Sequence, residues 1–195
     1  MRLIEVRPTD VFTDWFTGLR DREARARIAV RIRRLSLGNP GDVKPVGSDV
    51  SEMRIDYGPG YRCISSGAAT RLSSCSAAVT NDTRIATSRV PSNWRMRFRE
   101  DDMTRKTSRW DAADTLETKE DIAAYLDAVL EDGDPDLLKA ALGDIARAKG
   151  MTEIAQAAGL GRANLYKALS PDGNPEFATV ARVLKALGLR LSVAA

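Results

Sequence analysis

Histidine is absent from this chain of 195 residues, and cysteine occurs only at Cys63 and Cys75. Without histidine the chain cannot form a Ser-His-Asp nucleophile system and lacks the commonest general base. The two cysteines do not have the spacing of metal ligands, and a Cys/His zinc site is excluded. We therefore expect no metal and no cofactor.

Long apolar runs are also missing, so no membrane span and no membrane partner are expected. The first residues, MRLIEVRPTD, carry charges throughout and lack the apolar core of a signal peptide. A hydrophobic content of 43% allows a buried core, and 29% charged residues suit a soluble surface. These features predict a cytoplasmic protein of one or two domains.

Charge is distributed unevenly along the chain. Residues 1–102 contain 18 Lys and Arg against 13 Asp and Glu, a net of +5, whereas residues 103–195 contain 12 against 14, a net of −2. A basic half followed by an acidic half indicates either two units that attract each other or ordinary compositional drift.

The first 62 residues have the pattern of a small α+β domain with two helices and a small antiparallel sheet. RLIEVR alternates like a short strand, and the next segment has helical spacing at Phe12, Trp15, Phe16 and Leu19. A second helix is predicted over 21–36, before the stop signal GNPGD, and VKPVG and VSEMRIDY predict two strands. The apolar stripe of the helix predicted over 21–36 consists of Ala24, Ile28, Ile32 and Leu35.

The regular pattern ends after Arg62. In residues 63–101, 16 of the 39 residues are Ser, Thr or Ala, and neither a period of 2 nor one of 3.6 persists. Composition therefore predicts a poorly packed linker over 63–102.

Helical periodicity returns after Met103 and predicts an all-α unit. Thr115 or Thr118 is expected to cap one helix, and Gly150 to end the next. A final helix follows the loop SPDGNP, and LRLSVAA suggests a short terminal strand. The residues of that final helix expected to be buried are Phe177, Val180, Val183, Leu184 and Leu187.

Residues 151–169, MTEIAQAAGLGRANLYKAL, have the pattern of a helix-turn-helix. Gly159 supplies the left-handed turn residue, where a Cβ would be costly. Helix 161–169 is then the recognition helix, and the other interpretation is a pair of generic packed helices. The expected core positions are Ile154, Ala155, Ala158, Leu160 and Leu165.

The expected DNA-binding residues are Thr152, Arg162, Asn164, Tyr166 and Lys167. Arginine can pair with guanine, and asparagine with adenine, through two hydrogen bonds each. Thr152 is expected to cap the first helix and to contact a phosphate, and Tyr166 to reach DNA or to pack. Because one such module binds weakly, a homodimer on a two-fold operator is expected.

Residues 103–195 resemble a HigA-type addiction-module antidote over nearly their whole length. The similarity includes TLETKEDIAAYLDAVLEDGDPDLLKAALGDIARAKG, the helix-turn-helix and NPEFATVARVLKALGLRL. This resemblance implies an antitoxin that represses its own promoter and has a cognate toxin as partner.

Residues 1–62 resemble the matching HigB-type toxin of the RelE superfamily, in the motifs RIxRLxxGNxGDxKPVG and ExRIDYGPGYR. The superfamily consists of small α+β ribonucleases, many of which cut mRNA on the ribosome without a metal. The residues that match as catalytic candidates are Arg54, Tyr57, Tyr61 and Arg62. The family's later Leu-Leu-Cys-Gly-Gly-Asp-Lys segment, last strand and C-terminal helix are missing, so the resemblance implies a remnant toxin.

The genetic code offers an explanation for the loss of the toxin pattern after Arg62. When residues 75–81, CSAAVTN, are read from the third base of each codon, permissive wobble bases give Leu-Cys-Gly-Gly-Asp-Lys. The same frame permits a stop codon at Arg99–Glu100, shortly before Met103. We therefore interpret 63–102 as an out-of-frame segment after the loss of one nucleotide near codon 62, with a natural Ser/Ala-rich linker as the alternative.

Together these patterns predict a partial toxin over 1–62, an out-of-frame or linker segment over 63–102, and an antitoxin over 103–195. The first functional hypothesis is a DNA-binding antitoxin and autorepressor fused to an inactive toxin fragment. The alternative is a ribonuclease that is active or silenced by the attached antitoxin. Ribosomes and mRNA are expected partners only if the toxin is intact.

Overall fold

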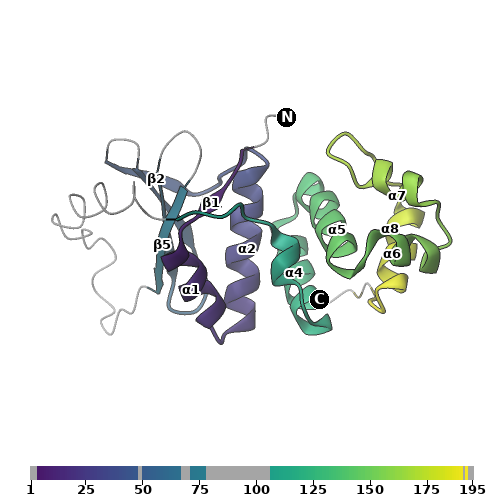
Figure 1. Ribbon diagram of the computed structural model, residues 1–195, viewed down its shortest axis with the longest axis horizontal. Helices are drawn as coiled ribbons and strands as arrows, with labels where there is room; N and C mark the ends of the chain where they lie inside the picture. Colours follow the sequence, from purple (N-terminus) through teal and green to yellow (C-terminus); the bar gives the residue numbers. More distant parts are fainter. Residues whose placement is uncertain (1–3, 48–49, 67–70, 78–105, 191, 193–195) are drawn as a thin grey trace. The chain divides into compact units, whose positions relative to one another are not determined.

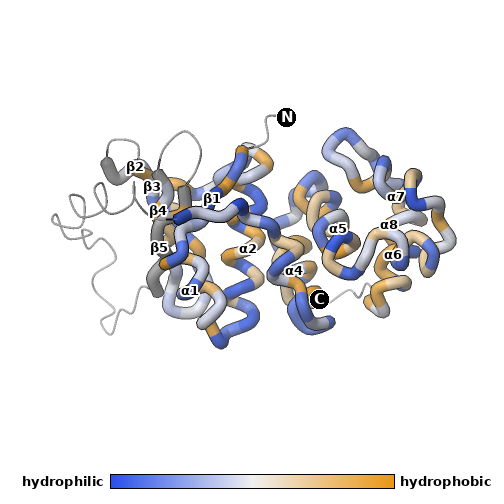
Figure 2. Tube along the Cα trace, in the orientation of Figure 1, coloured by the Kyte–Doolittle hydropathy of each residue, from blue (hydrophilic) through white to orange (hydrophobic). Residues whose placement is uncertain are grey.

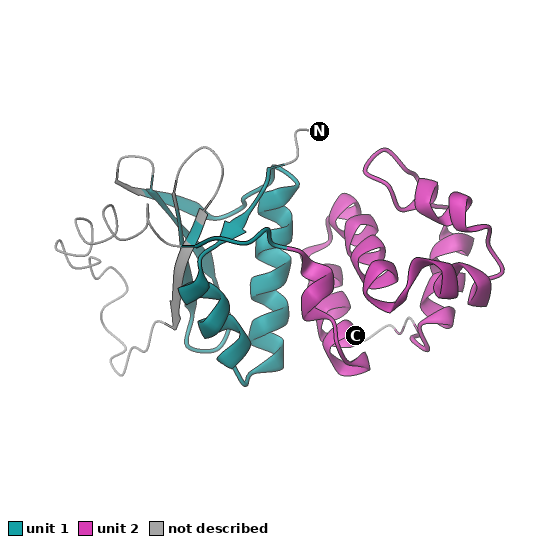
Figure 3. Cartoon of the chain, viewed as in Figure 1, with its two compact units in different colours: residues 1–110 teal, residues 111–195 magenta. Residues whose placement is uncertain are grey.

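The structure is a computed structural model, and it describes residues 4–47, 50–66, 71–77, 106–190 and 192. The chain divides into two compact units, Met1–Trp110 and Asp111–Ala195 (Figure 3). The division follows Trp110, because residues 106–110 pair with the N-terminal unit.

The N-terminal unit contains a five-stranded sheet in the order β1-β5-β4-β3-β2 (Figure 1). Strand β1 runs parallel to β5, and the other neighbouring strands are antiparallel. The strands are β1 (Arg7–Pro8), β2 (Val43–Gly47), β3 (Val50–Ile55), β4 (Tyr61–Ser66) and β5 (Arg71–Ala77). The expected α+β character is therefore present, but the prediction of a small antiparallel sheet was wrong in part, because the sheet has five strands and β1 pairs in parallel with β5.

Two capped helices accompany the sheet, α1 (Asp10–Gly18) and α2 (Arg22–Ser36). The Thr9 hydroxyl accepts a hydrogen bond from the Phe12 amide, and the Asp21 carboxylate accepts one from the Ala24 amide. Such bonds satisfy amides that a helix start would otherwise leave unpaired. The predicted apolar stripe of α2 is buried at Ala24, Ile28, Ile32 and Leu35.

The sheet continues into the segment for which composition predicted poor packing. Residues 63–66 lie in β4 and residues 71–77 in β5, and the side chains of Cys63 and Leu72 are fully buried. Strands β3 and β4 pair in one antiparallel register that starts at Ile55 and Tyr61. Backbone hydrogen bonds in this register extend β4 beyond Arg62, although the sequence there shows no clear apolar alternation. Residues 78–102 of the same segment lie outside the described residues.

The C-terminal unit is helical in its described part, as expected. It contains the short 3₁₀ helix η1 (Ala112–Thr115) and the α-helices α4 (Lys119–Asp132), α5 (Pro135–Lys149), α6 (Met151–Ala157), α7 (Arg162–Ala168) and α8 (Phe177–Ala186). Thr118 starts α4 in a capping box with Asp121, which confirms one of the two expected caps. Gly150 ends α5 at φ 93°, also as predicted.

Apolar positions of these helices recur with helical spacing along the chain (Figure 2) and form the core of the unit. Leu137, Leu142 and Ile145 of α5 are fully buried. Of the residues predicted for the last helix, Val183, Leu184 and Leu187 are buried and Val180 is half-buried.

The prediction was wrong for Phe177, which is 73% exposed. Phe177 is the first residue of α8, so its side chain precedes the turn that contacts the core. The terminal strand is not found at Leu189, Arg190 or Ser192, the described part of that segment.

Candidate DNA-binding surface

Two short helices, α6 and α7, are joined by a tight turn at residues 158–161. Gly159 lies in this turn at φ 65°, the left-handed conformation predicted from the sequence. The Leu160 amide donates to the Ala155 carbonyl over 2.8 Å, which closes the turn onto α6. Ile154, Ala155 and Ala158 are buried as expected, and so is Leu165 of α7.

All five side chains predicted to contact DNA are exposed. Tyr166 is 52% exposed, and the others also lie at the surface: Thr152, Arg162, Asn164 and Lys167. Within α7 only Leu165 is buried, and Leu169 at its carboxyl-terminal cap is buried too, while most of the helix surface faces outward. The structure thus gathers Arg162, Asn164 and Lys167 on one short exposed helix.

The expected capping role of Thr152 is not realised. Gly150 precedes the first residue of α6 and provides no side-chain cap. Because Gly150 ends α5 and also starts α6, Thr152 falls inside the first turn. Its hydroxyl is exposed there, close to the amino end of α6, where helix amides favour an anion such as phosphate.

Lys139 of α5 fixes the loop that follows α7, a role that sequence reasoning missed. Its ammonium donates to the Pro171 carbonyl over 2.8 Å and to the Gly173 carbonyl over 3.0 Å. It also pairs with the Asp136 carboxylate at 3.0 Å. Since the Lys139 side chain is only 12% exposed, these contacts hold the loop from beneath.

Gly173 brings the same loop against the end of α7. A Cβ at this position would overlap the carbonyl oxygens of Lys167 and Ala168. The loop can approach this closely only because residue 173 has no side chain. Lys139 and Gly173 therefore set the position of the carboxyl end of α7.

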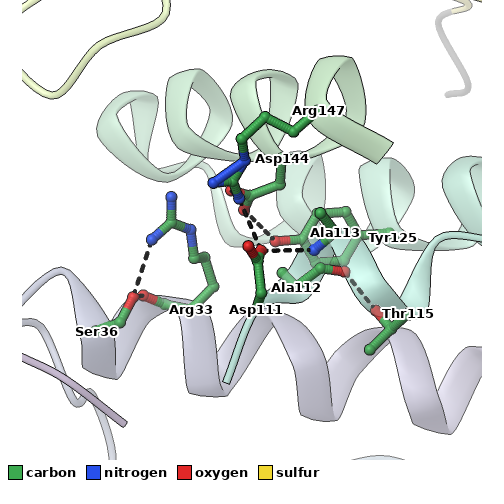
Figure 4. Close-up of polar contacts among 9 residues, drawn as sticks. All are labelled: Arg33, Ser36, Asp111, Ala112, Ala113, Thr115, Tyr125, Asp144 and Arg147. Atoms are coloured by element: carbon green, nitrogen blue, oxygen red, sulfur yellow. Dashed lines mark hydrogen bonds and ion pairs between the residues drawn. The ribbon is translucent and has the colours of Figure 1, made fainter. Parts of the chain in front are cut away.

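A polar cluster around the buried Asp144 fixes the start of the C-terminal unit (Figure 4). The Arg147 guanidinium donates to Asp111 over 2.7 Å and to the buried Asp144 over 2.8 Å. Asp144 also accepts a hydrogen bond from the Tyr125 hydroxyl over 3.2 Å. The Asp111 carboxylate additionally accepts from the Ala113 amide, so the chain segment before α4 is tied to α5.

In the N-terminal unit, two of the catalytic candidates are brought together by Glu52. The Glu52 carboxylate is 1% exposed and accepts from Arg54 over 2.7 Å and from Arg62 over 3.0 Å. Arg54 and Arg62 are opposite each other on β3 and β4. The hydrogen bond and the charge of Glu52 raise the pKa of the Arg54 guanidinium, so the group stays charged. Sequence reasoning missed Glu52, because a carboxylate in a strand is normally expected to face solvent.

The two tyrosine candidates have other neighbours. The Arg27 guanidinium lies 4.7 Å from the ring centroid of Tyr57, a cation–π contact. Tyr61 is 4% exposed, and its ring lies 6.2 Å from that of Trp15 in α1. Successive strand residues face opposite sides of a sheet, so Tyr61 packs on the helix side while Arg62 faces away. The four candidates therefore do not form one cluster.

Among the described residues no group of His, Cys, Asp or Glu could hold a metal ion. In the same part of the chain, none of the helices combines the length and the apolar character needed to cross a membrane.

The comparison with known proteins concerns the second half of the chain. A family model described as "Probable addiction module antidote protein" matches residues 106–195. A Haemophilus influenzae protein is 48% identical over 91 residues, which cover 94% of that protein and 47% of this chain. A second protein of the same organism is 44% identical over 59 residues, which cover 60% of it and 30% of this chain.

Both relatives carry only the description "Uncharacterized protein". No solved structure matches the chain. The match over 106–195 includes every helix of the C-terminal unit and the exposed face of α7. Through this region, the chain belongs to the family of probable addiction module antidote proteins.

Proposed function

We propose that residues 103–195 form an antitoxin that binds operator DNA through a helix-turn-helix made of α6 and α7 and represses its own operon. The observation that carries this proposal is that the polar and basic side chains of α7 are exposed while Leu165 of the same helix is buried. A short helix with most of its surface exposed can enter a major groove. The rest of the unit positions that helix.

The side chains of α7 suit both base and phosphate contacts. Arg162 offers two parallel donors to guanine, and Asn164 offers a donor and an acceptor to adenine. Lys167 and Thr152 suit the phosphate backbone, which positions the protein without reading sequence. Tyr166 suits a phosphate or the methyl group of thymine. A homodimer through the antitoxin part would present two such helices to a two-fold operator.

Operator binding by the full chain tests the proposal. The promoter DNA upstream of its own gene serves as the probe, in a gel-shift or fluorescence-anisotropy titration at fixed salt. Arg162→Ala and Asn164→Ala are each expected to weaken specific binding by about 1–3 kcal/mol. Arg182→Ala is the matched control, since Arg182 is an exposed arginine of α8. Unchanged operator affinity in both α7 variants would refute the assignment.

Salt dependence separates phosphate contacts from base contacts. Lys167→Ala is expected to weaken binding to operator and unrelated DNA alike, and to reduce the slope of log K against log salt by about 1. Arg162→Ala, in contrast, should reduce the difference in binding affinity between operator and unrelated DNA. If Lys167→Ala changes neither slope nor affinity, Lys167 does not contact phosphate.

We also propose that the N-terminal unit is a remnant of a RelE-type toxin without nuclease activity. The lysine of the family's Gly-Gly-Asp-Lys segment is absent from the sequence, and Tyr57 and Tyr61 are engaged with Arg27 and Trp15. The second candidate, a ribonuclease that is active or inhibited in cis, is favoured by the paired Arg54 and Arg62, which could bind phosphate. Cleavage of ribosome-bound mRNA by the purified chain would establish that candidate instead.

A further inference from the structure

Residues 106–110 run antiparallel to the chain around β1, along the edge of the N-terminal sheet. Strand β1 pairs with β5 on one side, and on the other side the chain returns antiparallel to it. The Ser108 amide donates to the Pro8 carbonyl over 3.2 Å, and the Trp110 amide to the Val6 carbonyl over 2.9 Å. The Asp10 amide donates in turn to the Lys106 carbonyl over 3.3 Å. These bonds share one register, so the pairing is a regular ladder.

Side chains reinforce this ladder at both ends of the segment. The ring of Trp110 meets that of Phe16 edge-on at 5.2 Å and that of Phe12 at 6.1 Å. Phe12 and Phe16 are 0% and 4% exposed, so Trp110 covers the aromatic core of α1. At the other end, the Arg7 guanidinium donates to the Thr107 hydroxyl over 3.2 Å. Within the described residues the Trp110 indole N–H has no hydrogen-bond partner, so ring packing provides the attachment.

The segment belongs by sequence to the antidote. The family match begins at residue 106 and therefore includes all of 106–110. The next residue, Asp111, is tied to Arg147 of α5 at 2.7 Å, which fixes the point where the segment leaves the helical unit. The region that matches the antidote family thus supplies a short extended segment, and the sheet beside which this segment lies supplies an edge with an aromatic cluster.

We propose that residues 106–110 are the docking arm with which an antidote of this family holds its toxin. The partner is a small α+β domain like residues 4–77, and the arm binds it by extending its sheet and seating an aromatic ring against α1. Addition of a strand to a sheet edge is an established mode of recognition, in which backbone bonds give affinity and side chains give specificity. The arm lies outside α6 and α7, so toxin and DNA are bound by different residues. The proposal rests on the antitoxin function proposed above.

Cutting the full chain between its halves makes the interaction intermolecular. A protease recognition sequence is inserted between residues 90 and 91, and the purified chain is cleaved. The two fragments are expected to remain together in size-exclusion chromatography, and their dissociation constant is measured by sedimentation. Trp110→Ala should weaken their association about 30-fold or more, as for a buried aromatic anchor. Trp110→Phe, which retains an aromatic ring, should keep most of the affinity between the fragments.

A second pair of variants tests the backbone ladder independently of the tryptophan. Ser108→Pro removes the amide that bonds to Pro8 and should separate the fragments, whereas Ser108→Ala keeps that amide and should leave them associated. The proposal is wrong if wild-type fragments separate, or if Trp110→Ala and Ser108→Pro bind as tightly as the wild type. Operator binding of the uncut variants is measured in parallel. If only the α7 variants lose operator binding, that result concerns the proposed DNA-binding function and does not test the docking arm.

Discussion

Asp144 is the residue through which the start of the helical unit is joined to its core. Its carboxylate is 1% exposed and accepts from both Tyr125 and Arg147. A buried carboxylate is stable only with such partners, and removing it takes away the acceptor that both donors use. Asp144→Ala is therefore expected to lower the free energy of unfolding by about 2–3 kcal/mol.

The bond to Tyr125 can be separated from the rest of this effect. In a double-mutant cycle of Asp144→Ala with Tyr125→Phe, we expect a coupling free energy of about 0.5–1.5 kcal/mol in urea denaturation of the full chain. Tyr166→Phe provides the control, because Tyr166 is exposed on α7. Additive effects of Asp144→Ala and Tyr125→Phe would mean that the hydrogen bond contributes nothing to stability.

Tyr61 makes the stability of the N-terminal unit sensitive to alkaline pH. Burial raises the pKa of its phenol above the ordinary value of 10.0, and the nearby negative charge of Asp21 adds to this. The folded unit therefore holds the phenolic proton more tightly than the unfolded chain. The resulting stability is complete below pH 10 and is lost as the pH rises through the higher pKa of the folded state.

Tyr61→Phe removes this titration while keeping the ring. We expect the decline of the urea midpoint above pH 10 to be shallower in Tyr61→Phe than in the wild type, with tryptophan fluorescence as the signal. At neutral pH the two proteins should differ little. An identical decline in both would show that Tyr61 does not drive the alkaline loss of stability.

At the scale of the element, two glycines near α7 are expected to respond differently to the same substitution. Gly159→Ala places a side chain at φ 65° with free space around it, so only backbone strain of about 1–2 kcal/mol is incurred. Gly173→Ala forces its Cβ into the carbonyls that end α7, so the loop must move. We expect Gly173→Ala to weaken operator binding more than Gly159→Ala does at temperatures where both variants are folded.

Circular dichroism melting and operator titration of the two variants check this order. Gly18→Ala is a useful control, because nothing lies within 4 Å of its Cβ and the residue lies outside the helical unit. If Gly173→Ala binds operator as tightly as Gly18→Ala, the loop does not set the position of α7.

Local signals account for the elements that could be predicted. The Thr118 cap, the Gly150 stop and the turn at Gly159 each depend on one residue and its immediate neighbours. The unpredicted features depend on contacts across the sequence. Glu52 needs Arg62 on another strand, Gly173 needs the end of α7, and the pairing of Thr107 with Thr9 joins distant parts of the chain.

At the scale of the whole molecule, strand β5 is unusual for its place in the sheet. It lies between β1 and β4, with a neighbour on each side. Inner strands of small sheets are commonly rich in Val, Ile and Leu, yet β5 reads RLSSCSA. In the frame that starts from the third base of each codon, the serine codons of this strand permit leucine. A frame change after codon 62 would thus supply the apolar strand that this position favours.

Inserting one nucleotide near codon 62 tests this idea on the gene itself. The restored frame is expected to encode an apolar strand, then Leu-Cys-Gly-Gly-Asp-Lys, and to stop shortly before the codon for Met103. Under the proposal that the N-terminal unit is a toxin remnant, the product is expected to arrest growth, because the lysine and the C-terminal segment of a RelE-type toxin are then present. Co-expression of residues 103–195 should relieve the arrest, and relief should weaken with Trp110→Ala, since the docking arm then lacks its anchor. The coding DNA alone can refute the idea: if its third-base frame lacks the Gly-Gly-Asp-Lys codons, no frame change occurred and the Ser/Ala-rich segment after Arg62 is natural.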